Sequence, residues 1–84
     1  MHSSPGTYLR QMREAASLTI DDVALATETT PPVCARVRAE WLAAIEADTA
    51  PIAIATLDAL ERVFPFERQV LDGLIAADAQ ERAA

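Results

Sequence analysis

The stretch W-L-A-A-I-E at residues 41–46 decides the fold of this 84-residue chain. Leu42 and Ile45 are three residues apart, so on a helix they share one face, and an acidic residue follows directly. A short turn with Pro51 comes next, and a second apolar stripe with helical spacing then follows: Leu57, Leu60 and Phe64. The pattern predicts two helices joined by a short turn and packed through these side chains.

The composition favours one all-helical domain. Alanine and leucine are abundant, only two glycines occur and runs of β-branched residues are absent, which favours helix. A chain of this length forms one domain at most. No apolar run reaches the roughly 18 residues that a membrane-spanning helix needs, no secretion signal is visible, and the lone Cys34 fits a reducing compartment. We therefore expect a cytoplasmic protein without a membrane segment.

Apolar periodicity predicts five helices over residues 7–78, between a flexible tail at 1–6 and a frayed end at 79–84. Thr19 and Asp22 have the spacing of a capping box at the start of the second helix. Thr30 is the expected N-cap of the third helix, with two prolines in its first turn. The expected helices cover residues 7–16, 19–27, 30–47, 53–63 and 65 onward.

The same periodicity predicts which side chains meet in the interior. Val37, Trp41 and Ile45 recur every four residues and are expected to face inward, as is Ile54. Cys34 is expected to be a buried structural thiol, because no histidine is placed beside it to activate it. The shared core is expected to contain Met12, Val23, Leu42, Ile45, Leu57 and Leu60.

Two segments carry a family resemblance. R-E-A-A-S-L-T-I-D-D-V-A at residues 13–24 resembles the opening of the Cro/repressor (XRE) helix-turn-helix family, in which an arginine and a small-residue break precede a Leu-Ser-Gln-x-x-Leu-Ala helix. L-x-x-I-E at 42–46, continuing through 51–60, resembles the second signature of that family. The resemblance covers residues 8–64. It implies a compact five-helix, lambda-repressor-like domain that binds double-stranded DNA, as small phage and prophage transcriptional repressors do.

The resemblance also implies particular residue roles. Arg13 and Glu46 match a pair in which the helix-one arginine neutralises the glutamate that ends the recognition helix. The base-reading positions of the family fall near Ala39, Glu40, Ala43 and Ala44. The chain departs from the family by having Ile20 in place of a phosphate-binding glutamine, and by about eight extra residues before the recognition helix.

Arg36 and Arg38 are the nearest residues that could replace the missing base readers, because arginine binds phosphate or pairs with guanine. Thr29 and Thr30 are candidate phosphate donors at the same helix start. The alternative is that both arginines are ordinary exposed side chains balancing nearby acids. The expected DNA-binding set is Thr29, Thr30, Arg36, Arg38, Ala39, Glu40 and Ala43.

The charge distribution leaves two functions open. The net charge is −6, with −1 in residues 1–40 and −5 in residues 41–84, whereas DNA-binding domains usually carry a basic surface. One reading is a transcriptional regulator that binds DNA as a homodimer. The other is a protein-interaction module on the same fold: an antitoxin, an anti-repressor or a phage packaging or assembly component. The dimer contact would come from the fifth helix, through Phe66, Val70, Leu74 and Ile75.

The sequence does not predict an enzyme, a metal site or a cofactor. One histidine, His2, and one cysteine are too few for tetrahedral metal ligation. Asp21 and Asp22 are better explained as first-turn partners of a helix dipole than as a catalytic carboxylate pair. Gly6 and Gly73 are the only glycines, so the chain has no glycine-rich phosphate loop.

Overall fold

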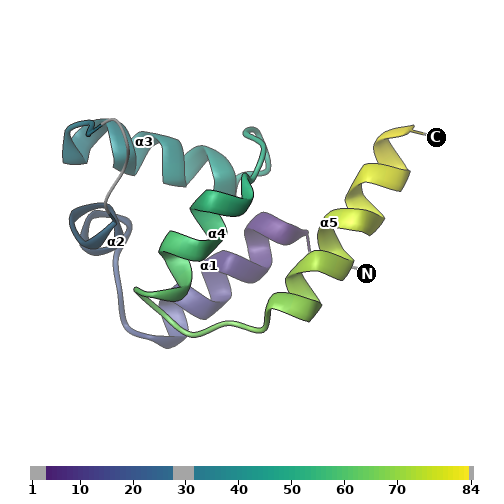
Figure 1. Cartoon of the computed structure of the whole chain (residues 1–84), viewed down its shortest axis with the longest axis horizontal. Coiled ribbons are helices and arrows are strands. Elements are labelled where there is room, and N and C mark those ends of the chain that lie inside the picture. Colours follow the sequence, from purple (N-terminus) through teal and green to yellow (C-terminus); the bar gives the residue numbers. More distant parts are fainter. Residues whose placement is uncertain (1–3, 28–31, 84) are drawn as a thin grey trace.

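The computed structural model describes residues 4–27 and 32–83, and these residues are all-helical, with no strand among them. The helices are α1 (Pro5–Ala15), α2 (Ile20–Ala26), α3 (Ala35–Glu46), α4 (Ile54–Glu61) and α5 (Arg68–Ala83). Figure 1 shows α3 across the top, α2 seen end-on below the start of α3, α4 in front of α1, and α5 to the right. The prediction of an all-helical, five-helix architecture is confirmed. Over the described ranges, no helix has the length and apolar character required to cross a membrane.

Helix α1 begins at Pro5, two residues before the expected start at Thr7. Proline is well tolerated there because the first N–H groups of a helix have no helical acceptor. Ser4 Oγ accepts a hydrogen bond from the N–H of Thr7 at 3.1 Å and so caps the helix. Pro5 and Gly6, which are expected in a flexible tail, are therefore helical and buried.

Helix α3 begins at Ala35, five residues later than predicted. The expected N-cap Thr30 lies outside the described residues, but residues 32–34 are not helical. Val33 and Cys34 have modest helix propensity, and Cys34 occupies the N-cap without a side-chain hydrogen bond to the helix. Residues 32–34 thus belong to the connection between α2 and α3. Cys34 is exposed there, so the prediction of a buried thiol is wrong.

Helices α4 and α5 are joined by a longer connection than predicted. Helix α4 ends at Glu61 and α5 begins only at Arg68, so Pro65 does not start the last helix. Phe64 in this connection is buried, and its ring centroid lies 5.7 Å from that of Phe66. Both rings pack against the core, and the residues that carry them are not helical. Helix α5 continues through Ala83, into the segment for which fraying is expected.

The predicted core forms. Val23, Leu42, Ile45, Leu57 and Leu60 belong to one buried cluster, and Met12 packs against it half-buried. Each fully buried aliphatic side chain contributes about 1.5–3 kcal/mol, so this cluster holds α3 and α4 against the first two helices. The remaining buried apolar residues of the cluster are Leu9, Ala24, Phe64 and Leu71.

Two expected core residues face solvent instead. Val37 is 46% exposed and Ile54 is 73% exposed. A helix turns about 100° per residue, so a four-residue repeat drifts by about 40° at each step. Trp41 is therefore half-buried at the edge of the core and Val37, two steps from Ile45, lies outside it. Ile54 stands at the first position of α4, where the inward side is occupied by Thr56, Leu57 and Leu60.

The first turn of α1 is fixed to the end of α3. A Cβ atom on Gly6 would lie 2.5 Å from the carbonyl oxygen of Ile45 and closer still to that of Glu46, so only glycine fits at this crossing. The N–H of Gly6 donates to Asp48 Oδ1 at 2.9 Å. Asp48 itself adopts the left-handed conformation, with φ 61°, in the turn after α3.

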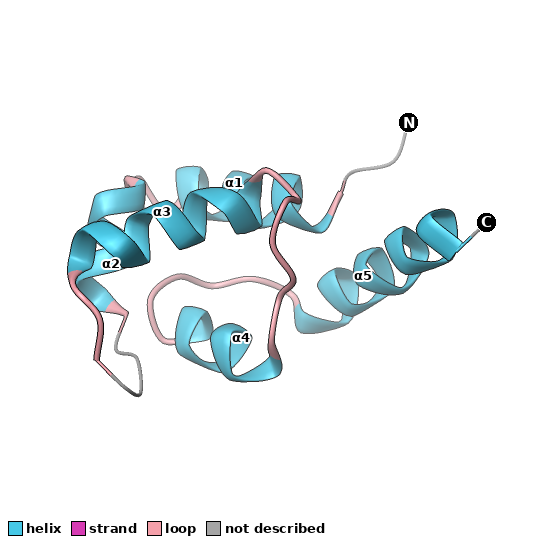
Figure 2. Cartoon of the chain, turned by 90° about the horizontal axis from the view of Figure 1, so that it is seen from above, coloured by secondary structure: helices cyan, strands magenta, loops and turns pink. Residues whose placement is uncertain are grey.

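Helix α5 is attached through its first half and extends away from the rest of the fold (Figure 2). Leu71 is completely buried. The N–H of Glu67 donates to Tyr8 Oη on α1 at 3.0 Å. Arg68 Nη1 donates to Asp58 Oδ1 and Glu61 Oε1 on α4, each at 3.0 Å. These hydrogen bonds raise the pKa of Arg68 above its ordinary value.

Candidate nucleic-acid interface

Helix α3 has one face on the body of the protein and the opposite face in solvent. Leu42 and Ile45 are buried on the inner face. At about 100° per residue, position 38 lies about 20° from position 45, whereas position 36 lies about 180° from it. The helix therefore separates Arg36 and Arg38, although both are predicted to contact DNA.

An ion pair fixes the end of α3 to α1. Arg13 Nε donates to Glu46 Oε2 at 2.8 Å, and Arg13 Nη2 donates to Glu46 Oε1 at 3.0 Å. The two side chains are only 11% and 14% exposed. Arg13 Nη1 also donates to the carbonyl oxygen of Leu18 at 2.7 Å. The hydrogen bonds with Glu46 raise the pKa of Arg13 above its ordinary value against the opposing effect of burial. The Arg13–Glu46 pair predicted from the resemblance is present. Its bidentate geometry favours one orientation of α3.

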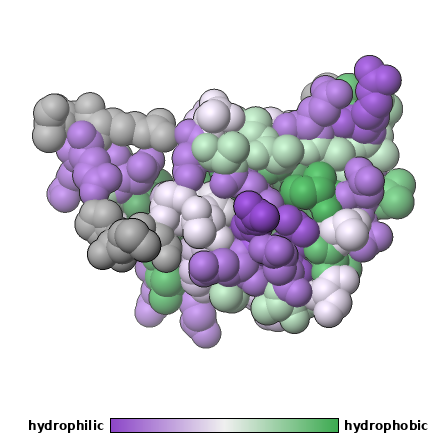
Figure 3. Space-filling view, turned by 180° about the vertical axis from the view of Figure 1, so that it is seen from behind, coloured by the Kyte–Doolittle hydropathy of each residue, from purple (hydrophilic) through white to green (hydrophobic). Residues whose placement is uncertain are grey.

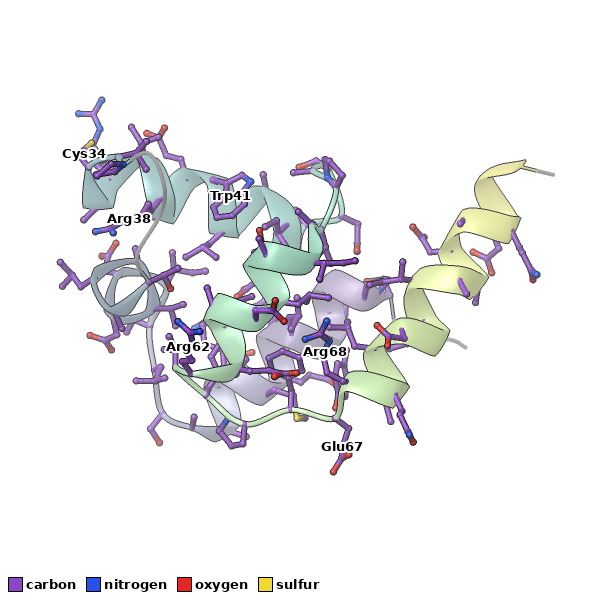
Figure 4. All side chains as sticks on the ribbon, in the orientation of Figure 1. Cys34, Arg38, Trp41, Arg62, Glu67 and Arg68 are labelled. Carbon is purple, nitrogen blue, oxygen red and sulfur yellow. The ribbon has the colours of Figure 1, made fainter. Side chains whose placement is uncertain are left out.

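Arg38 lies on the inner side of α3 and points toward α2 (Figure 4). Its Nη1 donates to the carbonyl oxygen of Thr27, which directly follows α2. Thr27 is buried, and its Oγ1 donates to the carbonyl oxygen of Val23 at 2.7 Å. Arg38 Nε is buried and has no hydrogen-bond partner among the described residues. The prediction that Arg38 shares a DNA-facing surface with Arg36 is therefore wrong, since its seven-residue spacing from Ile45 places it inward.

The outer face of α3 presents two charged side chains between small ones. Arg36 Nε lies 3.8 Å from Glu40 Oε1, and the two side chains are 87% and 69% exposed. An exposed pair of this kind contributes only about 0.3–0.5 kcal/mol, so a ligand could redirect both side chains at little cost. Ala43 is exposed on the same face, one turn further along, while Ala39 is half-buried at its edge.

The start of α2 has no cationic or amide side chain for phosphate. Ile20 is its first residue and is half-buried against the core. The predicted capping box is present, since Asp22 N–H donates to Thr19 Oγ1 at 3.1 Å and Thr19 N–H donates to Asp22 Oδ2 at 2.9 Å. This bond from the Thr19 backbone lowers the pKa of Asp22. The predicted phosphate donors Thr29 and Thr30 lie outside the described residues.

A hollow of about 300 Å³ lies between α1, the start of α2 and the second half of α3. Its charged lining is Arg10, Arg13 and Glu46, and its small or apolar lining is Ile20, Ala43 and Ala47. Figure 3, which shows the molecule from behind, has strongly hydrophilic atoms near the middle of that face, beside apolar ones. Sequence reasoning missed Arg10. The signal was its position three residues before Arg13, which places both on one side of α1.

No group of three or more histidine, cysteine, aspartate or glutamate side chains that could hold a metal ion occurs in residues 4–27 and 32–83.

Comparison of the chain with protein-family models, with curated proteins and with solved structures finds no match. The XRE resemblance thus stays a prediction from the sequence, and the function has to be inferred from the geometry of α1, α2 and α3.

Proposed function

We propose that this protein binds double-stranded DNA by inserting the outer face of α3 into the major groove, and that it acts as a small helix-turn-helix transcriptional regulator. The observation that carries the proposal is the outer face of α3 itself. It presents Arg36 and Glu40 one turn apart on a helix whose opposite face is fixed by core packing and by the Arg13–Glu46 pair.

The dimensions and chemistry of this face suit a major groove. An α-helix with its side chains is about 10–12 Å in diameter, and the groove is about 12 Å wide. Ala43 allows close approach of the helix and can contact a thymine methyl group. Arg36 can pair with guanine, and Glu40 can accept a hydrogen bond from the amino group of cytosine. A G·C-containing half-site is therefore the expected preference.

The charge distribution predicts weak binding to random DNA. Neutralisation of phosphates supplies most non-specific affinity, and residues 1–40 have a net charge of −1. The strongly acidic half, residues 41–84, supplies α4, α5 and the second half of α3, and Glu46 at the end of α3 is paired with Arg13. Affinity should thus depend on base contacts, and two copies on a two-fold operator would double them. Val70, 48% exposed on α5, and the half-buried Leu74 could contribute to that dimer contact.

The test is a salt titration of the protein with duplexes from upstream of its own gene, read by fluorescence anisotropy. Arg36→Ala is expected to weaken binding and to reduce the preference for a duplex with a G·C pair in the half-site over one with an A·T pair there, with no change in melting temperature. Arg38→Ala is the matched control, because it is expected to lower stability through loss of the bond to Thr27. Absence of binding to any duplex, or an equal G·C preference for the wild type and Arg36→Ala, would contradict the proposal.

A second function is favoured by exposed apolar side chains on α2, on α3 and in the connection between them. Leu25 on α2 is 71% exposed, Val33 before α3 is 42% exposed and Val37 on α3 is 46% exposed. Such side chains suit a protein-interaction module, such as an antitoxin, an anti-repressor or a phage assembly component. Leu25→Ser distinguishes the two functions, since it should leave DNA binding unchanged and should weaken binding to a protein partner.

A further inference from the structure

We propose that Arg10 binds a backbone phosphate of the DNA duplex at the hollow between α1, α2 and α3. Arg10 would thus supply the phosphate contact that Ile20, which has no hydrogen-bond donor in its side chain, cannot make. This inference rests on the proposed function and adds a contact on α1 to a DNA-binding set that otherwise comes from residues 29–43.

The charge of the hollow favours an anion although the protein as a whole is acidic. Glu46 is the one carboxylate in its lining, and its two oxygens accept hydrogen bonds from Arg13. The charges of these two side chains cancel, so the lining keeps the single positive charge of Arg10. Glu14 pairs with Arg10 from one turn away, Oε1 to Nε at 3.2 Å, but does not line the hollow.

The Arg10 side chain is available for a ligand. It is 62% exposed, and Glu14 is 56% exposed. An exposed pair four residues apart on a helix contributes little to stability. A phosphate group could replace the carboxylate of Glu14 without disturbing the core, and a guanidinium forms two parallel hydrogen bonds to phosphate oxygens.

The position of the hollow identifies the anion as part of a duplex. Ala43 belongs both to the outer face of α3 and to the lining of the hollow, and Ala47 continues that lining one turn later. A major groove occupied by the outer face of α3 is bordered by phosphate strands on both sides. One strand would pass the hollow, where two alanines leave room for the sugar-phosphate chain.

The experiment is a salt titration of full-length wild type, Arg10→Gln, Arg10→Lys and Arg62→Gln with the same duplex. Arg62 is a matched control, because it is an exposed arginine at the end of α4 (Figure 4) and does not line the hollow. Arg10→Gln is expected to make the negative slope of log K against log salt shallower by about one. It is also expected to weaken binding about tenfold near 0.1 M salt. Arg10→Lys and Arg62→Gln should keep the wild-type slope.

Equal slopes for wild type and Arg10→Gln, while Arg36→Ala weakens binding and loses the G·C preference, would overturn the role of Arg10 and leave the proposed function intact. A wild-type protein that binds no duplex would overturn both. Millimolar inorganic phosphate at constant ionic strength serves as a further probe by NMR. Shifts of the Ala43 and Ala47 amide resonances with phosphate alone, equal to those with duplex, would indicate a free-anion site and would also overturn the inference.

Discussion

Replacing Glu46 with alanine removes the acceptor of two hydrogen bonds from Arg13 in a place that water hardly reaches. The side chains of Arg13 and Glu46 are 11% and 14% exposed. Hydrogen bonding to Glu46 raises the pKa of Arg13, and arginine stays protonated at any accessible pH. The variant therefore leaves a charged guanidinium in a mostly buried position with only Leu18 O as its partner.

The expected loss of stability follows from this geometry. Removing one partner of a buried ion pair costs about 3–5 kcal/mol. The retained bond to Leu18 O and the slight exposure of the pair reduce this to about 2–4 kcal/mol. For a domain of this size, 1 kcal/mol corresponds to a shift of about 4–8 °C in Tm, so Glu46→Ala should lower Tm by about 8–32 °C. Glu46→Gln keeps one acceptor oxygen and should lie between the alanine variant and the wild type.

The assay is urea and thermal unfolding followed by far-ultraviolet circular dichroism. Glu40→Ala is the control, because its partner Arg36 is 87% exposed and the pair is worth at most about 0.5 kcal/mol. A double-mutant cycle with Arg13→Ala isolates the coupling between the two charges, and the double variant should be less destabilised than the two single losses combined. Equal midpoints for Glu46→Ala and Glu40→Ala, or a coupling energy near zero, would refute the reasoning.

Three further perturbations test the fold in the same unfolding assays. Gly6→Ala should lower the free energy of unfolding by about 2 kcal/mol or more, because its Cβ would meet the backbone of α3. Gly73→Ala, with nothing within 4 Å of its Cβ, should raise that free energy by about 0.5–1 kcal/mol, and similar values for the two variants would contradict the close crossing. Ser17→Gly should raise stability by about 0.5–1 kcal/mol, because Ser17 has φ 60° and glycine adopts that conformation without strain; a lower urea midpoint would count against it. The folded state lowers the pKa of Asp22, so its ionised form stabilises the protein above about pH 4 and that contribution is lost as the pH falls further. The Tm difference between the wild type and Asp22→Asn should therefore shrink between pH 6 and pH 3, and a constant difference would exclude this contribution of Asp22.

Some features of the protein follow from local rules that the sequence obeys directly. The capping box at Thr19 depends on a three-residue spacing. The burial of Leu42, Ile45, Leu57 and Leu60 depends on helical periodicity and on hydrophobicity, neither of which needs a distant partner. Even the inward position of Arg38 was contained in its seven-residue spacing from Ile45, since that spacing returns a helix to nearly the same side.

Other features depend on which surfaces come together, and no local pattern contains that information. The close approach of Gly6 to the end of α3 and the burial of Phe64 in the core exist only in the folded chain. Arg10 became a candidate ligand-binding residue only when α1, α2 and α3 enclosed a hollow around it. Sequence alone determined the helices and most of the inward faces, since backbone hydrogen bonding and periodicity act over a few residues. Tertiary structure decided the close crossing of α1 and α3 and the composition of the candidate site, because packing between distant segments sets them.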